Sequence, residues 1–526
     1  MRTLTIVAVG IGVLCLAAAA LHFGCANYCM EAQGMREMGL PVAAVPKAHG
    51  GTDNVNDAAF DAMFFRHYGV NPFIDTDDEP LSTFAVDVDT GSYTLCRSYM
   101  VRGYVPPKDA VRVEEFVNYF DYGYSPPEAG SPDAFAVHLE AAPSRFTPGR
   151  LLLRVGLKAR EVAAAARKPA ILTFIIDVSG SMQREDRLEL VKKSLGLLVD
   201  QLREGDRVGI AVYGSTGHRL LDHRGMERRK EILAAVKRLS PEGSTNAEEG
   251  LAIGYRMAAE AFVKGAINRV ILCSDGVANV GRTGPESILQ GIEQHARSGI
   301  TLTAVGFGMG NYNDVLMEQL ADKGQGHYAY VDTLAEARRV FVDNLTGTLQ
   351  VVARDAKVQV ALNPQTVRSY RLLGYENRAL RNKDFRNDKV DGGQVGAGHS
   401  VTALYELKLW PDKAGPLATV RVRYKEAEGA EVREQEKSVA RSDGRADFDA
   451  ASGSFRLTAT VAEFAEVLRK SYWARGHGLD AVLEAARKCP ADGRHGEAVA
   501  ELVRLIEKAA VLKADSGNDA GSSIEE

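Results

Sequence analysis

The arrangement of apolar and polar residues divides the chain into regions with different periods. In the N-terminal segment, residues 76–168, apolar and polar positions alternate at 135–140 and 151–158, which predicts paired β-strands. From 169 to 350, short apolar runs alternate with segments whose apolar residues recur every three or four positions. This succession of strands and helices predicts a doubly wound α/β domain with a mainly parallel sheet.

Alternation with a period of two returns in residues 351–450. Four strand candidates lie there: 356–362, 367–375, 400–409 and 418–424. Because strands both precede and follow the α/β domain, we expect them to share one β-sandwich into which that domain is inserted. Helical spacing at 455–512 predicts a helical C-terminal region, and the polar, acidic residues 513–526 predict a disordered tail.

The first strand of the α/β domain, predicted at 171–176, ends in a group of oxygen-bearing side chains. Asp177, Ser179 and Ser181 occupy alternate positions there, so a tight loop can direct one carboxylate and two hydroxyls toward one point. Oxygen ligands suit Mg²⁺, and they suit Mn²⁺ or Ca²⁺ less decisively. By itself the pattern is also that of an ordinary strand-to-helix turn.

Two later stretches place further oxygen ligands at loop ends. Thr245 lies in Gly-Ser-Thr-Asn before a predicted helix, and Asp275 lies in Ser-Asp-Gly after an apolar strand. The three stretches DVSGS, GSTN and SDG, in this order, resemble the metal-ion-dependent adhesion site of von Willebrand factor type A (VWA) domains. The resemblance implies that Ser179, Ser181 and Thr245 supply hydroxyl ligands and that Asp177 and Asp275 act directly or through water. It also implies one open coordination position for an Asp or Glu of a protein partner.

The resemblance extends beyond the α/β domain. STFAVDVDTGSYT, VRVEEFVNYFDYGY, YRLLGYENR, DFRNDKVDGGQVGAGHSVTALYE and the AEFAEVLRKS helix are similar to segments of a bacterial family of exported VWA proteins. That family has its own N-terminal segment and a C-terminal domain of unknown function. The resemblance therefore implies an architecture and does not assign an activity.

Composition adds several exclusions. A length of 526 residues predicts two to four domains, at roughly 150 residues each. The net charge of −5, without a basic domain or stripe, gives no reason to expect a nucleic-acid partner. The six cysteines are scattered, which excludes a disulfide scaffold, and no Cys/His cluster suggests zinc.

The N-terminus predicts export. Met1-Arg2 precedes an apolar run to Leu21, which is typical of a signal peptide, here residues 1–25. Cys25 follows a glycine, as in a bacterial lipoprotein signal, although His22 departs from that pattern. Lipidation at Cys25, cleavage after the alanine run and retention as a membrane anchor stay open. Residues 26–75 are predicted to be a linker. From the export signal we expect a protein of the cell envelope that is anchored to the membrane as a lipoprotein and faces the periplasm or the exterior.

The function favoured by these features is a divalent-metal-dependent protein-binding module at the bacterial cell envelope. One alternative is a structural or assembly protein in which the metal only stabilises the fold. Another is a metal-assisted hydrolase. The chain has no H-E-x-x-H, G-x-S-x-G or G-x-x-x-x-G-K-[ST] motif, and no histidine lies close in sequence to the five metal-site residues, so we do not expect an enzyme.

Overall fold

The computed structural model describes residues 63–86, 89–276, 285–310, 312–427, 429, 431–490 and 496–519. The predicted signal peptide with Cys25, and the predicted linker up to residue 62, lie outside these ranges. Among the helices that are described, none is both long enough and apolar enough to cross a bilayer.

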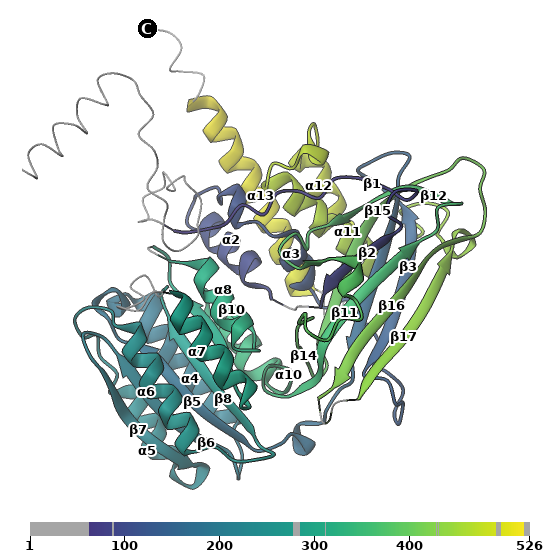
Figure 1. Cartoon of the computed structure of the whole chain (residues 1–526). Coiled ribbons are helices and arrows are strands. Elements are labelled where there is room, and N and C mark those ends of the chain that lie inside the picture. The colour runs from purple at the N-terminus through teal and green to yellow at the C-terminus, as the bar shows by residue number, and fades with distance from the viewer. Residues whose placement is uncertain are drawn as a thin grey trace, which may run out of the picture. The chain divides into compact units, whose positions relative to one another are not determined.

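The α/β domain is built on a six-stranded sheet in the order β10-β9-β8-β5-β6-β7 (Figure 1). All neighbours pair in parallel except β7, which runs antiparallel to β6 at one edge. The strands are β5 (Ala170–Asp177), β6 (Arg207–Tyr213), β7 (Gly217–Gly225), β8 (Ile267–Ser274), β9 (Ile300–Phe307) and β10 (Tyr328–Val331). Every residue of the central strand β5 is buried, because helices cover both faces of a doubly wound sheet. The predicted fold class is confirmed.

Two groups of helices cover the two faces of this sheet. Alternate residues of β5 point to opposite faces, so Phe174 packs in the cluster that holds α4, α5, α9 and α10, and Ile175 packs in the cluster that holds α6, α7 and α8. The helices are α4 (Leu190–Gln201), α5 (Arg229–Lys237), α6 (Ala247–Glu260), α7 (Pro285–Arg297), α8 (Asp314–Lys323), α9 (Leu334–Arg338) and α10 (Leu345–Leu349). A π-helical segment, η6 (Arg339–Asp343), joins α9 to α10.

Two antiparallel sheets form the β-sandwich. The first has the order β1-β12-β15-β4-β3 and the second β13-β2-β11-β16-β17, with β14 paired to β11. Their bounds are β1 (Ile74–Asp75), β2 (Leu81–Ala85), β3 (Phe135–Pro143), β4 (Leu151–Ala159), β11 (Val351–Leu362), β12 (Val367–Leu373), β13 (Ala379–Leu380), β14 (Val395–Gly396), β15 (Ser400–Leu409), β16 (Pro416–Glu426) and β17 (Val432–Ala440). Inward-facing residues of both sheets, such as Tyr405 and Val358, share one core.

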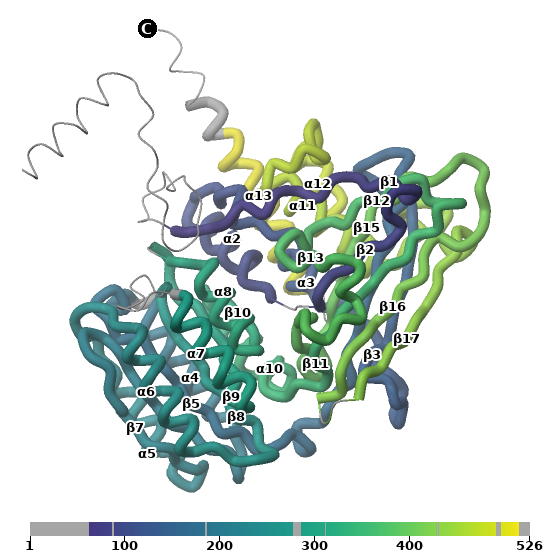
Figure 2. Tube along the Cα trace, viewed as in Figure 1, coloured from purple at the N-terminus to yellow at the C-terminus, as the bar shows by residue number. Residues whose placement is uncertain are grey.

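The α/β domain is inserted into this sandwich, as the sequence predicts. Strand β4 precedes the domain in the chain and β15 follows it, yet the two pair over Leu151–Lys158 and Ser400–Leu407. The chain leaves the sandwich after β4. It returns from α10 through the single residue Gln350 into β11 (Figure 2). The two connections between the sandwich and the α/β domain therefore lie before the start of β5 and after the end of α10.

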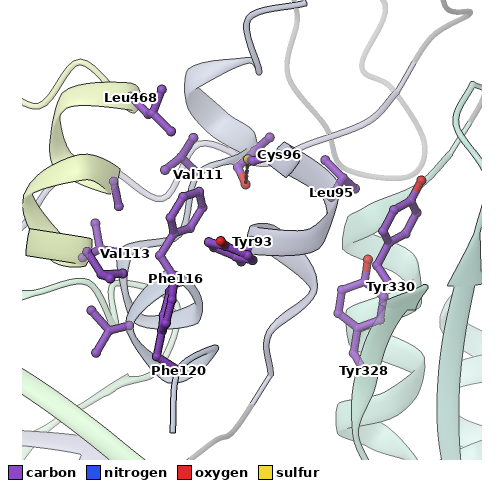
Figure 3. Packing of buried hydrophobic residues seen from close by; sticks show 14 of the residues in the cluster. Tyr93, Leu95, Cys96, Val111, Val113, Phe116, Phe120, Tyr328, Tyr330 and Leu468 are labelled. Atoms are coloured by element: carbon purple, nitrogen blue, oxygen red, sulfur yellow. Dashed lines mark hydrogen bonds between the residues drawn. The ribbon is translucent and has the colours of Figure 1, made fainter. Parts of the chain in front are cut away.

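Helices from both ends of the chain complete the structure. They are α2 (Gly91–Val101), α3 (Val113–Asn118), α11 (Gly453–Leu468), α12 (Leu479–Arg487) and α13 (Gly496–Asp519). Tyr93 of α2 stacks on Tyr119 at 3.9 Å between ring centroids and meets Phe116 edge-on at 5.3 Å. Figure 3 shows Tyr93 beside Phe116, with Tyr328 and Tyr330 of β10 beyond α2. The Thr94 hydroxyl donates a hydrogen bond to the Tyr330 carbonyl at 2.8 Å, so α2 lies against the edge strand of the α/β sheet.

Buried ion pairs connect these helices to the α/β domain. Arg97 of α2 pairs with Asp332 at 2.6 Å, Glu336 at 3.0 Å and Glu501 of α13 at 2.9 Å. Arg112 pairs with Asp314 of α8 at 2.6 Å. Because a buried charge is costly without a partner, these contacts hold α2 and α13 in one arrangement against the α/β domain.

A few elements differ from the sequence prediction. Met63 and Phe65, within the predicted linker, are buried, and α13 continues to Asp519, beyond the start of the predicted tail. The sequence pattern does not reveal α2 because Gly91–Met100 are buried on all sides and so lack an amphipathic period. It does not reveal β17 because that edge strand carries mostly polar, largely exposed side chains and pairs with β16 through its backbone.

Candidate metal centre

Asp177 lies at the carboxyl end of β5 with its side chain fully buried. Its Oδ1 accepts a hydrogen bond from the Ser179 amide at 2.8 Å, and its Oδ2 accepts one from the Ser274 hydroxyl at 3.1 Å. The Gly276 amide in turn donates to the Ser274 hydroxyl at 3.1 Å. The carboxylate is thus held by its own loop and by the neighbouring strand β8, which fixes its orientation before any ligand binds.

The two serine hydroxyls of the same loop lie side by side. Ser179 Oγ and Ser181 Oγ are 3.0 Å apart, and Ser179 is buried whereas Ser181 is exposed. The loop is short and helical, η3 (Gly180–Gln183), and the π-helical segment η4 (Glu185–Glu189) continues it into α4. Alternate spacing after a buried strand therefore does bring the predicted oxygen atoms together.

Thr245 lies half-buried on an adjacent loop that is tied to the serine loop. The Gly180 amide donates to the Gly243 carbonyl at 2.8 Å, and a Cβ on Gly180 would approach that carbonyl oxygen to 3.2 Å. The Glu242 amide donates to the Val178 carbonyl. Asn246 then caps α6 by accepting from the Glu249 amide at 3.3 Å. The threonine is therefore placed at the amino end of α6, beside the loop of Ser179 and Ser181.

Asp275 pairs with an arginine that sequence reasoning did not find. Arg187, in η4, is 5% exposed; its Nη1 donates to Asp275 Oδ2 and to the Ser181 carbonyl at 2.9 Å, and its Nη2 donates to the Met309 carbonyl. Gly308, at φ 71°, leaves the space that the Arg187 side chain fills. Arg187 thus links the serine loop, Asp275 and the end of β9.

The surroundings of Asp177 disfavour the ionised form of its carboxyl group. Burial raises the pKa of Asp177 to about 6, the negative charge of Asp275 adds to the effect, and the hydrogen bonds from Ser179 and Ser274 oppose it. A cation placed beside Asp177 would remove the cost of its charge. The electrostatics of the site therefore favour a cation beside Asp177.

The donor set fits a hard divalent ion. It consists of two carboxylates and the hydroxyls of Ser179, Ser181 and Thr245, with no nitrogen or sulfur, which matches Mg²⁺ better than Zn²⁺. In the described part of the chain, no group of three or more His, Cys, Asp or Glu side chains could hold a metal ion. The candidate therefore depends on hydroxyl ligands, and the binding of metal by these five residues stays a prediction.

Asp89, near the N-terminus, has a structural role. The sequence around Asp87, Asp89 and Thr90 favours solvated acids of an edge strand over metal ligands. Asp89 is instead buried: its Oδ1 accepts from the Tyr328 amide at 2.9 Å and its Oδ2 from Arg378 at 3.1 Å. Asp87 lies outside the described residues.

Comparisons with known proteins agree with this architecture. A model of the von Willebrand factor type A domain matches residues 172–345, a von Willebrand factor model matches 59–154, and the model of the C-terminal part of the uncharacterized protein YfbK matches 347–415 and 408–512. YfbK of Escherichia coli (strain K12) is 37% identical over 469 residues, which cover 85% of this chain and 80% of YfbK.

Two further similarities have lower sequence identity. Human inter-alpha-trypsin inhibitor heavy chain H3 is 29% identical over 184 residues, 34% of this chain and 19% of that protein. The solved structure of a von Willebrand factor type A protein from Catenulispora acidiphila is 17% identical with a TM-score of 0.43, and covers 72% of this chain and 90% of that one.

The fold and the matched model define the inserted α/β domain as a VWA domain. The chain as a whole belongs to the family of Escherichia coli YfbK. The family resemblance noted in the sequence is thereby confirmed.

Proposed function

We propose that the protein is a Mg²⁺-dependent protein-binding module of the bacterial cell envelope. VWA domains are commonly metal-dependent protein-interaction modules, and this chain has one. The observation that supports the proposal most is the preformed set of Asp177, Ser179 and Ser181, oriented by hydrogen bonds at one edge of the sheet. Mn²⁺ or Ca²⁺ would fit the same oxygen ligands less well.

The charge balance of the site favours an acidic partner. Asp177 and Asp275 carry two negative charges, and Arg187 compensates one of them through its pair with Asp275. A bound divalent cation would therefore leave a net positive charge at the edge of the sheet. A carboxylate of a partner Asp or Glu would neutralise that charge and complete the coordination of the ion.

We propose no catalytic role for these residues. Asp177 and Asp275 are assigned to holding the cation, so neither carboxylate is proposed as a general base. We further propose that the predicted export signal, with lipid at Cys25 or an uncleaved anchor, places the VWA domain at the envelope.

A pull-down from detergent-solubilised envelope tests this function. The baits are the wild-type protein, Asp177→Ala and the control Asp200→Ala, each with Mg²⁺ and with chelator; Asp200 is an exposed aspartate of α4 in the same domain. We expect one protein to be retained by the wild type and by Asp200→Ala in Mg²⁺ and to be lost from the other samples.

Equal recovery in all samples would contradict the proposal. If chelation lowered the melting temperature strongly while the retained proteins stayed the same, the metal would be structural, which is the second function considered for this chain.

A further inference from the structure

A pocket of about 520 Å³ lies at the edge of the VWA sheet opposite the candidate metal centre. Its lining includes the segments before or at the start of β5, β8 and β9, namely Lys168, Asn268 and Thr301, and it includes Gln350 between α10 and β11. The pocket thus lies where the VWA domain is joined to the sandwich. Its volume is in the range of small-molecule sites, which is roughly 300–1,000 Å³.

Arg269 of β8 lines this pocket and is 1% exposed. Its Nη1 donates to Thr303 Oγ1 at 2.9 Å and to the Thr348 carbonyl at 2.6 Å, and its Nε has no hydrogen-bond partner. No carboxylate of the described residues pairs with it. Burial lowers its pKa only to about 10, so the guanidinium is charged at neutral pH.

The other deeply buried arginines of this protein are compensated. Arg97 pairs with Asp332, Glu336 and Glu501, and Arg371 pairs with Glu406 at 2.8 Å and Glu466 at 3.0 Å. A buried charge without a counter-ion costs several kcal/mol. Arg269 is therefore a cation for which the folded chain, as far as it is described, supplies hydrogen bonds but no anion.

The rest of the lining adds positive charge. Six Lys and Arg and four Asp and Glu side chains line the pocket, and the exposed Arg354 and Lys389 make no ion pair within the described ranges. The acidic residues are largely engaged: Asp355 pairs with Lys425 at 3.0 Å, and Glu293 pairs with Arg297 at 2.8 Å. The uncompensated charge of the pocket is thus positive.

We propose that this pocket binds a small polar molecule that carries an oxyanion, a phosphate or a carboxylate, with Arg269 as its buried counter-charge. A planar guanidinium suits a two-oxygen acceptor. Arg354 and Lys389 would add charge at the mouth, and the side-chain NH2 group of Gln350 would hydrogen-bond the polar body of the molecule. A bound molecule would contact both segments that connect the VWA domain to the sandwich.

Calorimetric titration of the metal-free full-length chain with pyrophosphate and with citrate tests the proposal and separates the two kinds of oxyanion. We expect saturable binding of at least one probe, weakened at least about 10-fold by Arg269→Gln, because hydrogen bonds from a charged donor are stronger than those from a neutral one. Arg219→Gln is the control, because Arg219 is an exposed arginine of β7 that does not line the pocket. The Arg219→Gln variant should bind the probe with the affinity of the wild type.

A second variant keeps the test valid if Arg269→Gln fails to fold. Arg354→Gln with Lys389→Gln changes only exposed side chains and should weaken the same probe several-fold. Absence of saturable binding of both probes to the wild type, or wild-type affinity in these pocket variants, would overturn the proposal. If Arg269 of β8 served only to hold the Thr348 carbonyl of α10, Arg269→Gln would bind the probes with wild-type affinity.

Discussion

In chelator at neutral pH, Asp177→Asn is expected to be more stable than the wild-type protein by about 1–3 kcal/mol. The pKa of Asp177 is raised from 3.8 to about 6 by burial and by the charge of Asp275, so its ionised form destabilises the metal-free fold. Asparagine removes the charge and keeps the acceptor for the Ser179 amide, but it loses the acceptor for Ser274. Urea unfolding in chelator measures the difference.

Added Mg²⁺ should reverse the order of these two proteins. The wild type should gain stability as the ion binds the folded state only, and Asp177→Asn should gain little or nothing. Asp200→Asn, at the exposed position on α4, is the matched control and should behave as the wild type in both conditions. If Asp177→Asn were the less stable protein in chelator, the charge of Asp177 would not destabilise the metal-free fold. If it gained as much from Mg²⁺ as the wild type, Asp177 would not be a cation ligand.

Acidification from pH 7 to pH 5 is expected to cost about 2 kcal/mol of stability for each of two histidines, of which His327 is buried and His399 half-buried. His327 precedes β10 of the VWA domain and His399 precedes β15 of the sandwich, with ring centroids 5.3 Å apart. Burial lowers the pKa of both to about 3; Arg269 adds to the effect on each, and His327, Lys158 and Arg339 add to the effect on His399.

The direction of the pH effect follows from which state binds the proton. The unfolded histidines bind protons near pH 6.5, and the folded ones do so only near pH 3. Stability from this pair is therefore present above pH 6.5 and is lost as the pH falls toward 3. Urea unfolding at pH 7 and pH 5 measures the loss.

Comparison of variants isolates this pair from the other titrating groups. His327→Gln with His399→Gln should reduce the loss between pH 7 and pH 5 by about 4 kcal/mol, because neutral glutamine takes up no proton. His218→Gln, at an exposed position of β7, should leave the loss unchanged. An equal pH dependence in the double variant and the wild type would show that the two rings are not held neutral by the fold.

Much of this structure follows from local patterns in the sequence. The apolar run of β5 predicts a strand buried on both faces, and all its residues are buried. The alternation at 135–158 and again after 350 predicts strands of one sandwich, and β4 pairs with β15 across the inserted domain. These features are visible because a strand or helix that buries one face carries its period in its own residues.

Features that depend on distant contacts are not visible in the sequence. Arg187 lies in a polar run, Gln-Arg-Glu-Asp-Arg, that is typical of an exposed helix start, and it is buried only because Gly308 and Asp275, far along the chain, accommodate it. His327 has no neighbour in sequence that indicates its contact with His399. The roles of such residues come from the tertiary structure, so local periodicity does not predict them.

The most direct test of the metal centre is a calorimetric titration of the metal-free chain with Mg²⁺. The matched variants are Ser181→Ala, which removes an exposed hydroxyl of the proposed ligand set, and Ser244→Ala, which removes an exposed hydroxyl of the neighbouring loop outside that set. We predict saturable binding to the wild type and to Ser244→Ala, and at least about 10-fold weaker binding to Ser181→Ala. No saturable binding to the wild type, or equal affinity in all three proteins, would contradict a Mg²⁺ site formed by Asp177, Ser179, Ser181, Thr245 and Asp275.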